Sequence, residues 1–113
     1  MTTYVFDIDG TICSNTLGEY EKAEPITARI NIINNLYDAG NTIIFQTARG
    51  MGSSGNNTQL AVEKWREFTL LQLKEWGLRY HQLFLGKPAG DIYIDDKGQG
   101  DTFFFQNYLG GDV

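Results

Sequence analysis

Short apolar segments alternate with longer segments of helical period along this chain, and this order restricts the fold more than any other feature. Runs rich in β-branched and aromatic residues, bounded by turn residues, predict strands. These runs cover residues 3–8, 42–46, 83–85 and 92–94. Apolar residues recur at helical spacing in the intervening segments 25–40 and 58–76. Strands that alternate with helices favour a parallel sheet.

We therefore expect an α/β fold of the Rossmann-like type, with a parallel sheet and helices on both faces, in three layers. The length of 113 residues suits a single domain over residues 1–113. The tail after Gly98 is ambiguous, because its apolar run 103–105 fits a strand or a helix. From about residue 106 we expect the tail to be flexible.

The composition limits the cellular compartment and the binding partners that we expect for this chain. The single cysteine, Cys13, excludes an internal disulfide, and we expect it to be a small buried residue. No apolar run reaches the length of a membrane span, and no leader pattern is visible, so we expect a cytoplasmic protein without a membrane partner. The net charge of −5 counts against nucleic acid as a partner, because phosphate binding needs clustered Lys and Arg.

Polar residues follow each predicted strand where that strand ends. These residues are Asp7 and Asp9, Thr47, Lys87, and the pair Asp95 and Asp96. In parallel sheets the carboxyl ends of the strands meet at one edge, and ligands bind there. The sequence therefore predicts an active site at this edge.

Four segments in order resemble the motifs of the haloacid dehalogenase superfamily. They are Asp7-Ile8-Asp9-Gly10-Thr11, Thr47, Gly86-Lys87-Pro88 and Ile94-Asp95-Asp96. The resemblance covers residues 3–97 and implies the core fold of that superfamily. The Asp-x-Asp-Gly-Thr form is similar to its phosphatase and phosphotransferase branch. The intervals between motifs are already filled by one helix and its connections, which implies a member without a cap domain.

The resemblance implies a role for each carboxylate. Asp7 is the expected nucleophile and forms an aspartyl-phosphate. Asp9 is the expected general acid and base. Asp95 is expected to anchor Mg²⁺, with Asp7 and the backbone carbonyl of Asp9 as further ligands. Asp96 is expected to act through a metal-bound water. Mn²⁺ shares this oxygen chemistry.

The resemblance also implies a phosphate-binding set. Its members are Ile8, Gly10, Thr47, Ala48, Arg49 and Lys87. Thr47 offers a hydroxyl, and Lys87 offers a positive charge that also orients Asp7. Arg49 is expected to face the mouth of the site and contact the substrate phosphate or a hydroxyl.

Local charge explains why a cation is expected. The four aspartates carry −4 when ionised, Mg²⁺ reduces this to −2, and Lys87 with Arg49 brings it to zero. Without the metal, an incoming phosphate meets strong repulsion, so we expect turnover to depend on a divalent cation.

Simpler interpretations exist for each residue taken alone. Asp7 with Asp9 can be a turn, Thr47 a strand-end cap, and Lys87 a solvated lysine. An EF-hand is excluded because Gly10 stands fourth and not sixth in the loop. A receiver domain is disfavoured because its acidic pair belongs to the first strand. His81 is expected to make a structural hydrogen bond. Lys97 has two equally expected roles, as a charge partner of Asp95 and Asp96 or as a solvated surface lysine.

The substrate is the least determined part of the prediction. Residues 41–51 and 76–81 resemble small phosphatases of capsular or surface polysaccharide synthesis, which favours a phosphorylated carbohydrate. A phosphatase of polynucleotide ends and a non-catalytic phosphate- or metal-binding module are the alternatives. A site without a cap suits a large substrate, or a homo-oligomer in which the neighbouring subunit covers the site. The Gly- and Ser-rich loop 50–57 is expected to be a partial lid.

Overall fold

The structure is a computed structural model of the chain, and it describes residues 1–109. The elements are β1 (Thr3–Asp7), the 3-10 turn η1 (Tyr20–Lys22), α1 (Thr27–Asp38), β2 (Thr42–Thr47), α2 (Thr58–Glu75), β3 (Gln82–Leu85) and α3 (Asp101–Leu109). Among the described residues, none of the helices has the length and hydropathy of a membrane-spanning segment.

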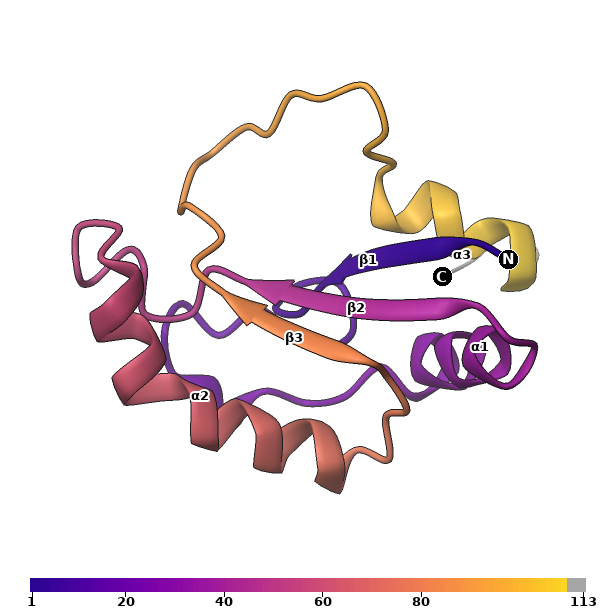
Figure 1. Ribbon diagram of the computed structural model, residues 1–113, viewed down its shortest axis with the longest axis horizontal. Helices are drawn as coiled ribbons and strands as arrows, with labels where there is room; N and C mark the ends of the chain where they lie inside the picture. The colour runs from indigo at the N-terminus through magenta and orange to yellow at the C-terminus, as the bar shows by residue number, and fades with distance from the viewer. Residues whose placement is uncertain (110–113) are drawn as a thin grey trace.

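The three strands form one parallel sheet in the order β1-β2-β3 (Figure 1). Phe6 pairs with Phe45, and Phe45 pairs with Leu83. The first three predicted strands and both predicted helices are therefore confirmed to within two residues at either end. The structure is an α/β fold of Rossmann-like character.

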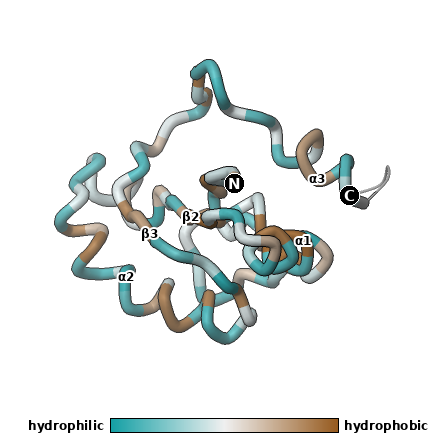
Figure 2. The backbone as a smooth tube through the Cα atoms, turned by 45° about the vertical axis from the view of Figure 1, so that its right-hand side comes forward, coloured by the Kyte–Doolittle hydropathy of each residue, from teal (hydrophilic) through white to brown (hydrophobic). Residues whose placement is uncertain are grey.

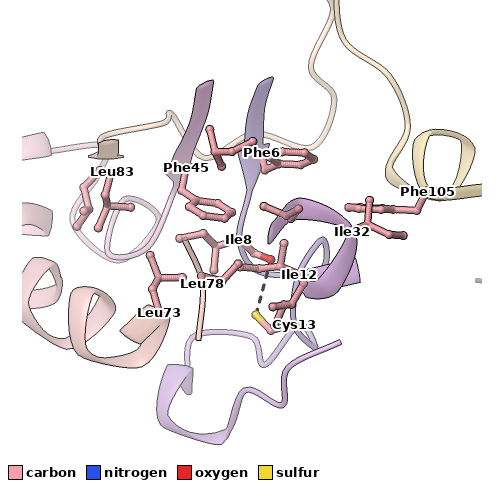
Figure 3. Close-up of a cluster of buried hydrophobic side chains, with 14 residues drawn as sticks. Phe6, Ile8, Ile12, Cys13, Ile32, Phe45, Leu73, Leu78, Leu83 and Phe105 are labelled. Carbon is pink, nitrogen blue, oxygen red and sulfur yellow. Dashed lines mark hydrogen bonds between the residues drawn. The ribbon is translucent and has the colours of Figure 1, made fainter. Parts of the chain in front are cut away.

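The core lies between one face of the sheet and the helices. Side chains that share this face, together with the turn after β1 and the three helices, form a single buried cluster (Figure 3). Its largest fully buried members include Phe45, Phe105, Ile8, Ile12, Ile33, Ile43 and Leu73. The alternation of buried and exposed residues in β3 shows that only one face is covered there.

The opposite face of the sheet is open. Val5 and Phe84 project there and remain 53% and 52% exposed. The helices on both faces that we expected are not seen among residues 1–109. Right-handed crossovers that step in one direction, from β1 to β2 to β3, place both connecting helices on the same face. The alternation of strands and helices along the sequence does not reveal the order of the strands in the sheet. It therefore could not predict that both helices cover the same face.

Residues 86–100 form an arm that contains no helix or strand and arches away from the sheet (Figure 1). The predicted strand 92–94 is therefore wrong for this conformation. Local hydrogen bonds hold the arm instead: the Tyr93 hydroxyl donates to the Pro88 carbonyl at 2.6 Å and accepts from the Gly90 N–H at 3.0 Å. A strand needs a neighbour for its backbone groups, and three apolar residues do not specify one.

After the arm, α3 returns to the body of the molecule. Phe105 is fully buried and stacks on Phe6 with ring centroids 6.0 Å apart. Arg29 of α1 donates to the Asp101 carboxylate at 2.6 Å. The ambiguous apolar run is thus helical. The flexible tail expected from about residue 106 stays a prediction: α3 extends to Leu109, and residues 110–113 lie outside the described part.

We expect Phe105→Ala to lower the free energy of unfolding by about 3–5 kcal/mol, because it leaves a cavity in a fully buried position. Phe103→Ala is the matched control, since Phe103 lies on the same helix and is 63% exposed. Its effect should stay within about 0.5 kcal/mol. Urea unfolding measures both variants. Equal effects would contradict the docking of α3 through Phe105.

Candidate active site

Three polar residues expected at the carboxyl edge of the sheet lie together there. Asp7 ends β1, Thr47 ends β2, and Lys87 follows β3. The ammonium of Lys87 lies 3.4 Å from Asp7 Oδ1. The Lys87 N–H donates to the Thr47 carbonyl at 3.2 Å, which ties the chain after β3 to the end of β2. The hydroxyl of Thr11 lies 3.3 Å from the other Asp7 oxygen.

A tight turn after β1 positions Asp9. The carbonyl of Ile8 accepts hydrogen bonds from the Thr11 and Ile12 N–H groups, and Gly10 adopts a φ of 84°. Ile8 and Ile12 are both fully buried, so the turn is anchored in the core.

Two groups that were expected to bind phosphate make hydrogen bonds within the protein's own turns in this conformation. The Gly10 N–H donates to the Cys13 carbonyl at 2.9 Å. The Thr47 hydroxyl oxygen accepts from the Arg49 N–H at 3.1 Å, and Thr47 is almost fully buried. The hydroxyl proton of Thr47 remains the group that this residue can offer to a ligand.

Arg49 does not face the mouth of the site, which corrects the sequence-based expectation. The side chain is fully buried, and its guanidinium binds both carboxylate oxygens of Asp9, at 2.9 and 3.0 Å. It also donates to the Thr69 hydroxyl at 3.2 Å and lies 4.8 Å from the centre of the Tyr20 ring. Two parallel hydrogen bonds to a carboxylate give a strong and strictly oriented pair.

The pair with Arg49 constrains what Asp9 can do. Both of its oxygens already accept hydrogen bonds from the guanidinium, and the Cys13 thiol lies 3.6 Å from one of them. To exchange a proton with a ligand, the Asp9 carboxyl must share or release one of these contacts. Sequence analysis missed Tyr20 and Thr69 as supports of Arg49, because no spacing along the chain links them to it.

Asp7 is the partly buried carboxylate of the site. Burial raises its pKa above the ordinary value, and the nearby Lys87 cation only partly offsets this effect. The side chain is still 31% exposed, so a ligand can reach it. A carboxylate with a perturbed pKa beside a lysine at a strand edge is typical of a functional position.

Two other residues behave as expected from the sequence. Cys13 is buried, and burial together with the Asp9 charge raises its pKa to about 12, so the thiol stays protonated. His81 Nδ1 accepts from the Ile43 N–H at 3.0 Å, and its ring stacks on Tyr37. Both roles are structural.

Asp95 and Asp96 lie on the exposed arm and are not brought to the edge of the sheet. The Asp95 carboxylate accepts from the N–H groups of Lys97 and Gly98, which lowers its pKa. Asp96 lies 3.6 Å from the ammonium of Lys97, with both side chains exposed. In residues 1–109 no three acidic, His or Cys side chains cluster in a way that could hold a metal. Asp95 and Asp96 are thus not gathered with Asp7 and Asp9 in this structure, and the Mg²⁺ site stays a prediction.

The loop 50–57 lies beyond the carboxyl edge and borders an open groove. Gly50, Ser53 and Ser54 line this groove together with Trp65 of α2, and its volume is about 450 Å³. The Ser54 hydroxyl donates to the Gly50 carbonyl at 2.6 Å, and Asn56 accepts from the Ala89 N–H at 2.9 Å. The loop is thus tied to the start of the arm, and its role as a partial lid stays a prediction.

Comparison with known proteins supports the fold. No protein-family model and no curated protein matches the chain. The crystal structure of an MCSG target from Vibrio cholerae is similar with a TM-score of 0.83 and 23% identity, over 92% of this chain and 87% of that one. A chain of the Pnkp1/Rnl/Hen1 complex is similar with a TM-score of 0.58 and 16% identity, over 97% of this chain and 35% of that one. At these identities both structures show the fold alone, an α/β fold with a parallel sheet.

Removing the buried guanidinium should be costly. Arg49→Met leaves the Asp9 carboxylate without its cation, and we expect a loss of about 3–5 kcal/mol in the free energy of unfolding. Arg79→Met is the control, because Arg79 pairs with Asp38 on the surface and should cost less than about 1 kcal/mol. Chemical denaturation measures both. A small loss for Arg49→Met would mean that the pair contributes little.

The raised pKa of Asp7 predicts a pH-dependent stability. The folded chain holds this proton more tightly than the unfolded chain, so stability falls as the pH rises from 3.8, the ordinary value, through the folded-state pKa. Asp7→Asn removes this penalty. The variant should therefore be more stable than the wild type at neutral pH and equally stable below pH 3.8.

Urea unfolding of both proteins between about pH 3 and pH 8 measures this difference. A variant that is less stable than the wild type throughout neutral pH would show that the ionised carboxylate stabilises the fold.

Proposed function

We propose that this chain is a phosphomonoester hydrolase that works through an aspartyl-phosphate on Asp7. The observation that supports this best is the half-buried Asp7 carboxylate beside Lys87 at the carboxyl edge of a parallel sheet. A phosphate that approaches this edge meets a nucleophile and a positive charge together. Lys87 offsets part of the repulsion between the two anions.

The proposed chemistry has two steps. An oxygen of Asp7 attacks phosphorus, the bond from phosphorus to the substrate oxygen breaks, and the leaving oxygen takes a proton from Asp9. Water then attacks phosphorus, gives a proton to Asp9, and releases inorganic phosphate with the Asp7 carboxylate restored. In this scheme the Thr47 hydroxyl donates a hydrogen bond to a phosphate oxygen.

The Arg49 pair adds a condition to this scheme. Asp9 must carry a proton before it can donate one, whereas both of its oxygens accept hydrogen bonds from the Arg49 guanidinium, at 2.9 and 3.0 Å. We therefore propose that Asp9 turns out of this pair when substrate binds. Arg49 acts as a positioning residue and not as a substrate contact.

A divalent cation remains part of the proposal as a requirement. Mg²⁺, or Mn²⁺ in its place, would reduce the negative charge that the phosphate adds to Asp7 and Asp9. The side chains gathered at the edge do not make a metal site, so no step is assigned to the cation.

The proposed substrate is a sugar phosphate or a related polysaccharide precursor. The proposed enzyme is cytoplasmic and has no cap domain. The sequence resemblance of residues 41–51 and 76–81 supports this choice. A polynucleotide-end phosphatase is the second candidate. A chain of the Pnkp1/Rnl/Hen1 complex is similar to this chain in fold. The net charge of −5 argues against this second candidate. A non-catalytic binding module is the third candidate.

Phosphate release tests the proposal. We expect the wild type to release phosphate from one sugar phosphate with Mg²⁺ and not with excess chelator. Asp7→Asn should abolish release, and Asp9→Asn should slow it by about 10²–10⁴. Asp38→Asn is the control. Asp38 is exposed and forms a surface ion pair with Arg79, so this substitution should not change the rate.

The panel also includes nucleotides and a 3′-phosphorylated oligonucleotide. Release from the oligonucleotide alone would favour the second candidate. Full activity in Asp7→Asn would contradict the nucleophile, and no release from any compound by a folded protein would favour a binding module.

A further inference from the structure

We propose that the free edge of β3 binds an extended segment of a partner protein that carries an Asp or Glu side chain. The partner's backbone pairs with Gln82–Leu85 as an added strand, and its carboxylate binds Arg66 of α2. This docking surface shares no residue with the candidate active site. It does not depend on the proposed phosphatase function.

β3 is an edge strand with one side unpaired. It pairs with β2 in the parallel sheet and with no other described strand. The backbone N–H and C=O groups on its outer side are therefore available to an added strand. Addition of an extended segment to such an edge is a recurrent mode of protein recognition, in which the main chain supplies affinity and the side chains supply specificity.

A groove of about 510 Å³ follows this edge. Among the residues that line it are Leu83, which is buried, and Phe84, which is 52% exposed. These two side chains point to opposite faces of the sheet, so a groove that contacts both runs along the edge between the faces. Arg66 and Leu70 of α2 line the groove from the helix side. α2 lies beside β3 in Figure 2 as it does in Figure 1.

The groove offers a positive charge and hydrogen-bond donors but no carboxylate. Besides the four residues above, it is lined by Tyr80, His81 and Gln82. His81 Nδ1 accepts from the Ile43 N–H at 3.0 Å, so the neutral ring carries its proton on Nε2 and can donate from there. The Gln82 amide and the Tyr80 hydroxyl are further donors. A groove of this kind, in a chain with a net charge of −5, favours an acidic ligand.

Arg66 is a cation without an acidic partner in residues 1–109. None of the ion pairs among the described residues includes it, and its guanidinium donates to the Leu83 carbonyl at 3.4 Å. Glu63 and Glu67 lie near it along α2, and neither lines the groove. The other three arginines each bind a carboxylate at 2.6 to 2.9 Å; they are Arg29, Arg49 and Arg79. A guanidinium that is free to bind a carboxylate through two hydrogen bonds gives a specific contact.

These charges favour a partner protein over a second copy of this chain. If two copies paired through β3 about a two-fold axis, the groove of each copy would meet the groove of the other. Neither groove has a carboxylate for the opposite Arg66, and the two guanidinium groups would add like charges to the interface. A segment that holds an acidic residue beside apolar residues pairs with the cation and covers Phe84 at the same time.

The position of Arg66 and Phe84 defines the pattern of the partner segment. Neighbouring side chains of an added strand point to opposite faces of the sheet. An acidic residue on the face of α2 reaches Arg66, and an apolar residue next to it packs on Phe84 on the open face. The partner segment therefore alternates acidic and apolar residues over the length of β3.

Selection from a random peptide library tests this preference without assuming a sequence. Displayed peptides of about nine residues are selected on the immobilised wild type, and fluorescence anisotropy then measures the affinity of the enriched peptides. We expect them to share an Asp or Glu flanked by apolar residues. Arg66→Gln should weaken their binding by about tenfold or more. Lys64→Gln is the matched control, because it removes one positive charge from an exposed position of the same helix, and it should leave binding unchanged.

Three results of the selection would overturn the proposal. They are the absence of any enriched peptide, enrichment of peptides without an acidic residue, and equal binding to the wild type and Arg66→Gln. Inorganic phosphate and acetate are then added as competitors. If either displaces the peptide at an equal molar concentration, the groove is a site for small anions and the proposal is wrong.

Methylation of the peptide backbone tests strand pairing without altering the protein. In a strand added to β3, alternate N–H groups of the peptide point toward β3 and toward solvent. Methyl groups on one alternate set of peptide nitrogens should abolish binding, whereas methyl groups on the other set should be tolerated. Equal effects of the two sets would show that the peptide does not bind as a strand.

Amide NMR signals show where the peptide binds. In the ¹⁵N-labelled wild type we expect the signals of Gln82–Leu85 and the side-chain signal of Arg66 to shift, and those of Thr3–Asp7 at the opposite edge of the sheet to stay in place. Shifts at Asp7 and Lys87 instead would place the peptide at the candidate active site. Sedimentation then tests for a second copy, and a dimer that the peptide dissociates would show that another copy of the chain occupies the edge. Either result would overturn the proposal.

Discussion

The buried Arg49 guanidinium is the interaction on which the architecture of the edge depends. It joins the turn after β1 through Asp9, α2 through Thr69, and η1 through the Tyr20 ring. Three segments far apart in the sequence are thus held by one side chain that is itself shielded from water. A buried charge tolerates little displacement of its partners, because an unpaired ion in the interior is costly.

Because of this arrangement, Asp7 and Asp9 lie in different environments. Asp9 is held in a fixed orientation by its cation, whereas Asp7 is partly buried, has a raised pKa and remains within reach of a ligand. Neighbouring carboxylates in unlike surroundings can take unlike chemical roles. Such a site lowers the stability of the fold, because burial penalises the charge on Asp7. Among the described strands, β1 pairs on one side only.

Most of the fold and part of the site could be predicted from the sequence. Residues 3–7, 42–47 and 82–85 are strands, as their β-branched and aromatic content predicts, and the carboxyl ends of these strands do place Asp7 and Lys87 together. The strand expected at 92–94 failed because strand propensity says nothing about the presence of a neighbour. Arg49 was expected to contact substrate, since its buried partners come from distant segments that spacing cannot reveal.

The sequence by itself determined the element order, the parallel sheet and the edge where polar residues gather, because these follow from local periodicity and from the direction of parallel strands. Only the tertiary structure decided which face the helices cover, where Arg49 points, and that Asp95 and Asp96 stay on an exposed arm. These outcomes depend on strand order and on contacts between residues far apart in the chain. Local pattern carries no information about such contacts.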